Sequence, residues 1–192
     1  MMKRTILRGA AFLMLALSLL AVQACRAPSE LDPFREALGN MTSATASVTT
    51  SIASPLGDVS AEYAVTYSNG SAEVTYVRDS LSQITPDTDP DDLNTTKGET
   101  VTVTPDNTGK LGKLVANVLF GKILLNEELI EYTVNGEVLD FTVKADAAEE
   151  ILGASIGYDA EVRITLAEGK LAKIEVNYNA IGGKANLTAD FD

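Results

Sequence analysis

The residue best suited to chemistry in this 192-residue chain is Cys25, its only cysteine. A basic start at positions 3–8 and an uncharged apolar run over residues 9–22 precede it, which is the layout of an export signal. Val22-Gln23-Ala24-Cys25 is similar to the sequence at which bacterial lipoprotein signals are cleaved and the cysteine is lipidated. The apolar run is shorter than the roughly 18–20 residues that a membrane-spanning helix needs. We therefore expect a removable signal peptide over residues 1–24.

A diacylglyceryl group on Cys25 would fix the chain to a membrane, because two acyl chains anchor stably where one binds only marginally. Residues 25–30 would then be the lipidated cysteine and its tether, of which residues 26–30 reach at most about 17 Å when extended. The expected location is the extracytoplasmic face of a bacterial membrane, with the bilayer as partner. Cleavage by an ordinary signal peptidase suits the same residues and would give a secreted protein instead.

Other residue types offer little for catalysis. The chain has no histidine, so it has neither a Ser-His pair nor an imidazole ligand for zinc. The neighbouring carboxylates Glu149 and Glu150 fall in a polar helical stretch with no convergent partner, which indicates solvated side chains. We expect no enzyme and no cofactor.

Four aspartates crowd one polar loop, at Asp87, Asp89, Asp91 and Asp92. An EF-hand starting at Asp87 needs glycine at its sixth position and glutamate at its twelfth. Those positions hold Asp92 and Gly98, so the loop is not an EF-hand. The remaining alternatives are a solvated acidic loop, which we favour, and an irregular weak calcium site.

The charge of the chain excludes one class of partner. Of its 15 basic residues three lie in the signal, which leaves 12 against 27 acidic residues and a net charge of −15. A surface this negative repels phosphate backbones, so nucleic acid is not expected as a partner.

Tyrosine is the most informative residue type inside the expected sheet. All six tyrosines fall on the apolar phase of an alternating segment, beside small or medium apolar residues. A buried tyrosine hydroxyl normally needs a hydrogen-bond partner, and a concave apolar surface with a few polar groups is typical of a ligand pocket. Either an ordinary core or a ligand site fits this pattern. The candidate ligand-binding residues are Tyr63, Tyr67, Tyr76, Tyr132, Tyr158 and Tyr178.

Alternation of apolar and polar residues predicts about nine strands after residue 43, most with one apolar and one polar face. Turn signals such as Asn69-Gly70, Asn135-Gly136 and Glu168-Gly169 separate them. Helical spacing predicts a short helix that Asp32 caps, a second helix over about 110–120, and two helical turns over 146–152.

Residues 31–192 are therefore expected to form a single α+β domain. A sheet of about nine strands must curl or split. The simplest arrangement is a strongly curved antiparallel sheet, or incomplete β-barrel, with short helices covering its concave face.

Two stretches resemble the LolA-like and LppX/LprG-like families of bacterial lipoproteins. One runs from Phe34 to Thr45 (FREALGNMTSAT) and on into Val48 and Ile52, and the other is the late hairpin Leu166–Val176 (LAEGKLAKIEV). The resemblance implies a LolA-like half-barrel with helices over its mouth and a cavity for acyl chains or acylated molecules. No binding residue of these families is matched by position.

The expected function is that of a membrane-anchored lipoprotein that binds, and in one version carries, a hydrophobic or acylated ligand. The alternative is a cell-envelope interaction or structural lipoprotein whose sheet has a filled core and no ligand. The sequence identifies no protein partner for either.

Overall fold

The computed structural model describes residues 28–41, 43–54, 57–68, 70–79, 98–108, 111–180 and 183–192. The expected signal peptide, Cys25 and the four aspartates at 87, 89, 91 and 92 lie outside these residues. Residues 28–32 are described by themselves, and the sheet domain is described from Pro33 onward.

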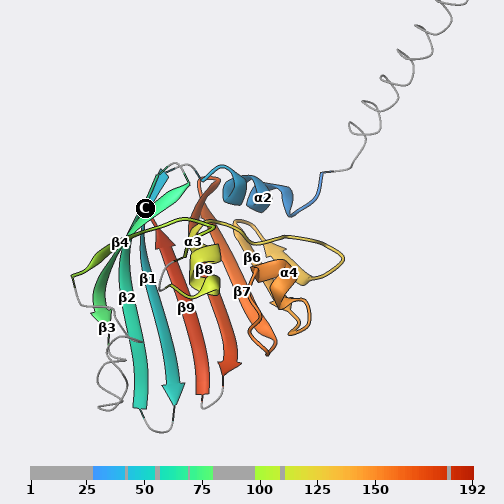
Figure 1. Ribbon diagram of the computed structural model, residues 1–192. Helices are drawn as coiled ribbons and strands as arrows, with labels where there is room; N and C mark the ends of the chain where they lie inside the picture. Colours follow the sequence, from blue (N-terminus) through green and yellow to red (C-terminus); the bar gives the residue numbers. More distant parts are fainter. Residues whose placement is uncertain are drawn as a thin grey trace, which may run out of the picture. The chain divides into compact units, whose positions relative to one another are not determined.

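The domain is built on one antiparallel sheet, in which the described residues form nine strands in the order β4-β3-β2-β1-β9-β8-β7-β6-β5. The strands are β1 (Ser43–Ser54), β2 (Gly57–Ser68), β3 (Ser71–Asp79), β4 (Thr100–Val103), β5 (Glu131–Asn135), β6 (Val138–Val143), β7 (Ala160–Ala167), β8 (Lys170–Ala180) and β9 (Gly183–Phe191). Strands β1–β4 and β5–β9 are two meanders, which the pairing of β1 with β9 joins (Figure 1). Because β4 and β5 do not pair, the sheet is open, and the predicted nine-stranded antiparallel architecture is confirmed.

Rows of apolar side chains cross the sheet because neighbouring strands keep their alternation in register. The central row is continuous over eight strands and is fully or largely buried on the sheet's middle strands. From β3 to β5 it consists of Tyr76, Tyr63, Val48, Ala189, Ile174, Ile164, Leu139 and Val134. We call the side of the sheet that carries these rows the apolar face, and the opposite side the polar face.

Two irregularities interrupt the alternation. The pairing shifts between Glu62 and Tyr63, where β3 holds one extra residue. It shifts again between Thr165 and Leu166, where β8 holds one extra residue. Such bulges bend a strand locally and re-aim its side chains, so strict alternation could not predict them.

The hairpin turn between β7 and β8 follows its sequence signal. Glu168 and Gly169 both have positive φ, at 53° and 74°, as a two-residue type I′ turn requires. The predicted turn at Glu168-Gly169 is confirmed by the pairing of Ala167 with Lys170 on either side.

Helix α2 (Asp32–Gly39) begins in a different way from the prediction. The Asp32 carboxylate accepts a hydrogen bond from the Ser29 backbone N–H at 2.9 Å, and the Ser29 hydroxyl accepts one from the Leu31 N–H at 3.2 Å. The bond from the Ser29 N–H to Asp32 is one half of a capping box with Ser29 as the cap. The Ser29 hydroxyl accepts from the residue two positions on rather than three. The expectation that Asp32 itself caps the helix was wrong, because the turn starts three residues earlier.

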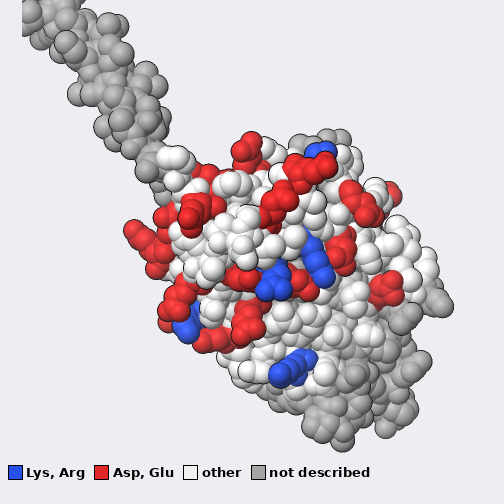
Figure 2. All heavy atoms as spheres, turned by 180° about the vertical axis from the view of Figure 1, so that it is seen from behind, with Lys and Arg blue, Asp and Glu red and all other residues white. Residues whose placement is uncertain are grey.

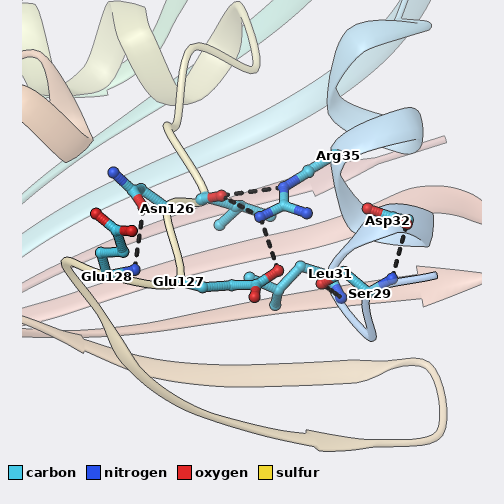
Figure 3. A network of polar contacts seen from close by, with 8 residues as sticks. Ser29, Leu31, Asp32, Arg35, Asn126, Glu127 and Glu128 are labelled. Carbon is cyan, nitrogen blue, oxygen red and sulfur yellow. Dashed lines mark hydrogen bonds and ion pairs between the residues drawn. The ribbon is translucent and has the colours of Figure 1, made fainter. Parts of the chain in front are cut away.

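Within the domain, Arg35 of α2 forms hydrogen bonds and an ion pair with the segment that follows α3. Its guanidinium donates to the Leu125 carbonyl at 3.0 and 2.8 Å and to the Glu127 carboxylate at 3.2 Å (Figure 3). The same segment comes close to the helix end at Gly121, where an added Cβ would lie 2.8 Å from the Leu38 carbonyl oxygen. Phe34, Ala37 and Leu38 are the buried residues of α2.

Helices α3 (Lys113–Leu119) and α4 (Ala148–Leu152) lie on the same side of the sheet (Figure 1). Both predicted helical segments are therefore present, and both are shorter than expected. The Asn117 amide donates to the Leu152 carbonyl at 2.9 Å and links the two helices. Gly121 (φ 61°) and Gly153 (φ 64°) follow the helix ends in left-handed conformation, as helix-terminating glycines do.

Candidate functional site

The candidate site is an open apolar depression of about 250 Å3 between helix α3 and strands β1, β2, β8 and β9, which we call the α3 groove. Leu114 and Val115 of α3 line one wall. Ile52, Ala61 and Leu187 line the sheet wall. Its volume is close to the lower end of the roughly 300–1,000 Å3 of small-molecule pockets.

A few hydroxyls interrupt this apolar lining. Thr50, Tyr63 and Tyr178 all border the groove. Burial raises the pKa of the Tyr178 hydroxyl above its usual value, because the phenolate would lose hydration there. Apolar walls with a small number of hydroxyl groups suit a hydrophobic ligand that carries a small polar end.

The groove exists because α3 covers the apolar face incompletely. Leu139, Ile164 and Ile174 on the central row have no exposed area, whereas Ile52 at the end of β1 is 38 % exposed. Leu114 and Val115 on the facing helix are only half-buried. An apolar residue left this accessible beside apolar neighbours marks a surface that a ligand or partner can bury.

The structure brings together only two of the six candidate tyrosines, Tyr63 and Tyr178, at the α3 groove. Tyr76 is 2 % exposed and meets the Tyr63 ring edge-on, with ring centres 5.2 Å apart. Tyr67 meets the Phe120 ring in the same way at 5.5 Å. Tyr67 and Tyr76 are thus packed against other rings.

The remaining two tyrosines do not line the α3 groove. Tyr132 is half-buried on the edge strand β5, opposite Phe141 of β6. Tyr158 precedes β7, is 38 % exposed and is on no strand, so its predicted place on an alternating strand was wrong. The reason is a turn at Gly157 (φ 69°), which delays the start of the strand.

Asp159 holds that turn in place. Its carboxylate accepts the Ala145 backbone N–H at 2.9 Å and a hydrogen bond from Lys144 at 3.2 Å. The bond from Ala145 and then that from Lys144 lower the pKa of Asp159 below its usual value. This polar anchor explains why residues before Ala160 leave the alternating pattern.

A second depression, the α2 groove, measures about 730 Å3 between α2, the β7–β8 turn and the ends of β1 and β9. Leu171 and Phe191 line it, but so do the charged residues Glu36, Lys170 and Asp192. Charged walls bind water strongly, so an apolar chain fits this groove less well than the α3 groove.

Sequence alternation alone places Ile52, Ala61 and Leu187 on the apolar face, and helical spacing places Leu114 and Val115 on one stripe. Nothing in these patterns shows that the two sets face each other across a gap. Glu149 and Glu150 are exposed on α4, in line with solvated side chains.

No protein-family model matches the chain, and no curated protein matches its sequence. Over the described ranges, no group of three or more His, Cys, Asp or Glu residues is arranged to hold a metal ion. Over the same ranges, no helix has the length and apolar character that crossing a bilayer requires.

Proposed function

We propose that this protein is a lipoprotein, anchored by diacylglyceryl-Cys25 at the extracytoplasmic face of a bacterial membrane, that binds a single hydrocarbon chain in the α3 groove. The observation that carries the proposal is the groove itself: an apolar depression of about 250 Å3 with half-buried walls and hydroxyls from Tyr63 and Tyr178. The open nine-stranded sheet with helices on its apolar face supports a LolA-like half-barrel as the finer description of the fold.

A fluorescent fatty acid tests the binding function directly. We expect saturable binding to the delipidated protein and at least tenfold weaker binding by Val115→Arg, which places a charge in the groove. Val77→Arg is the matched control, because Val77 is a 40 % exposed valine on β3 that does not line the groove. Absence of saturable binding, or equal affinity of the two variants, would reject the proposal.

A reporter can be placed in the groove because the chain contains no tryptophan. Ile52→Trp introduces the only indole, at a position that is 38 % exposed. We expect its emission to shift to shorter wavelength when the fatty acid binds, since the ligand removes water from the ring. An unchanged emission at saturating fatty acid would place the ligand elsewhere.

The membrane anchor is tested separately by labelling cells with radioactive fatty acid. The wild-type chain should incorporate label and Cys25→Ala should not. A wild-type chain without label, or a Cys25→Ala chain that retains it, would favour secretion over lipidation.

One observation favours the second candidate function, a cell-envelope interaction lipoprotein without a ligand. The central row of the apolar face is filled: Val48, Ala189, Ile174, Ile164 and Leu139 have no exposed area. In that case the α3 groove is an unfilled margin of the core, and the fatty acid will not bind saturably.

A further inference from the structure

Strand β5 offers an open backbone edge. It is the last strand in the sheet order, so within the described residues it pairs with β6 on one side only. Asn135 pairs with Val138 around a two-residue turn, and such a closing pair exchanges both of its backbone hydrogen bonds. Alternation along the strand then turns the N–H and C=O groups of Tyr132 and Val134 away from β6, toward the free edge.

The chain around this edge is strongly acidic. Residues 127–161, which hold β5, β6 and α4, contain ten Asp or Glu and one basic residue, Lys144. Residues 162–192 contain four of each sign. Lys144 is already paired with Asp159 at 3.2 Å. Seen from behind the view of Figure 1, carboxylates predominate over the few basic side chains (Figure 2).

A polar hollow of about 580 Å3 adjoins the edge on the polar face, and Glu131 and Glu161 line it. Arg163 also lines the hollow, but its guanidinium bonds the Asp140 carboxylate at 2.6 and 3.1 Å, which offsets its charge. Glu131 and Glu161 are exposed and form no ion pair with the residues that the structure describes. The hollow therefore presents uncompensated negative charge next to the free backbone edge.

We propose that β5 is a docking edge for an extended basic segment of a partner protein, which adds as a tenth strand. Its backbone would bond the outward N–H and C=O groups of Tyr132 and Val134. Its lysine or arginine side chains, at every second position, would lie beside Glu131. Glu161, two strands further in on the same row, would add to the negative potential of the hollow. Its intervening apolar side chains would extend the apolar face beside Tyr132 and Val134, which are both half-buried.

A labelled peptide of alternating lysine and valine, added to the full chain, is the probe. We expect saturable binding that weakens with salt. A peptide of the same composition with lysines and valines in separate blocks is the control, because it has the charge without the strand pattern. Equal affinity of the two peptides would overturn the proposal and leave only non-specific attraction.

Variants separate the backbone from the charge. Val134→Pro removes an outward N–H without removing a bond to β6, and Val134→Ala keeps that N–H with a small side chain. We expect at least tenfold weaker binding by Val134→Pro than by Val134→Ala, and a several-fold loss in Glu131→Gln with Glu161→Gln. Unchanged binding by Val134→Pro would overturn the proposal.

Amide hydrogen exchange of the wild-type chain covers the case in which Val134→Pro does not fold. The lysine-valine peptide should slow exchange at Tyr132 and Val134 relative to Glu131 and Thr133. Equal protection along β5, or none, would overturn the proposal. A concentration-dependent dimer of the protein alone that Glu131→Gln leaves intact and Val134→Pro abolishes would also overturn it, since the occupant would then be a second copy.

Discussion

The middle of the apolar face and its end at the α3 groove have the same alternation of apolar and polar residues but different roles. Ile164 on β7 and Ile52 on β1 both belong to apolar rows, yet Ile164 is 0 % exposed and Ile52 is 38 % exposed. In the sheet, Ile164 lies between Leu139 and Ile174. Ile52 lies between Val59 and Ala185. What lies over the two positions also differs. Helices α3 and α4 contribute buried side chains on this side of the sheet, whereas the end of β1 borders the open α3 groove. Apolar residues of the alternating strands therefore become core or binding surface according to which elements pack on them.

The largest expected effect separates the two regions by stability. Ile164→Ala should cost about 2–5 kcal/mol of the free energy of unfolding, because it leaves a cavity in closely packed surroundings. Ile52→Ala should cost less than about 1 kcal/mol, because water already reaches that side chain. Urea unfolding followed by circular dichroism measures both. Equal losses would mean that Ile52 is packed as tightly as Ile164 and that the α3 groove is closed in solution.

A smaller loss of stability is expected at Gly121, in the segment that follows α3 and lies close to α2. Gly121→Ala combines a left-handed backbone (φ 61°) with a Cβ placed 2.8 Å from the Leu38 carbonyl oxygen. We expect a loss on the order of 1–3 kcal/mol in the free energy of unfolding. Gly136→Ala is the matched control, with φ 63° but no atom within 4 Å of the new Cβ. If the two variants lose equal stability, the approach of α2 to this segment is looser than the structure shows.

The smallest effect concerns the hydroxyl at the open end. Since burial raises the folded-state pKa of Tyr178 above its usual value of 10.0, its contribution to stability is complete below pH 10. That contribution is lost as the pH rises through the folded-state pKa. An alkaline ultraviolet titration should show one late tyrosine that Tyr178→Phe removes, and a bound fatty acid should delay it further. A late tyrosine that persists in Tyr178→Phe would assign the burial to another residue.

Much of the fold was predictable because the alternation along each strand indicates which of its residues lie on the apolar face and which on the polar face. Local sequence patterns predicted nine strands, the Glu168-Gly169 turn and the two short helices α3 and α4. Tyr158 shows the limit: its phase fits β7, but the Gly157 turn and the Asp159 anchor keep it off the strand. The extra residues in β3 and β8 escaped prediction for the same reason, since alternation assumes an unbroken ladder.

For the candidate site, the sequence predicted which residues lie on the apolar face but not which of them come together. The alternation marked Tyr63 and Tyr178 as apolar-face residues together with four other tyrosines, and it had no means of ranking them. Which of them borders a groove depends on the path of α3, and that path depends on contacts between residues far apart in the chain. The bond from Asn117 to the Leu152 carbonyl is one such contact.

The sequence by itself determined the lipoprotein-like segment that ends at Cys25, the negative charge, the strand alternation and the two faces of the sheet. Each of these is a local property of residue type and spacing. Only the tertiary structure decided the pairing of β1 with β9, the burial of Ile164 against the exposure of Ile52, and the free edge at β5. These follow from how distant segments share a limited area of apolar surface. A residue's own neighbours in sequence cannot specify which part of that area is left uncovered.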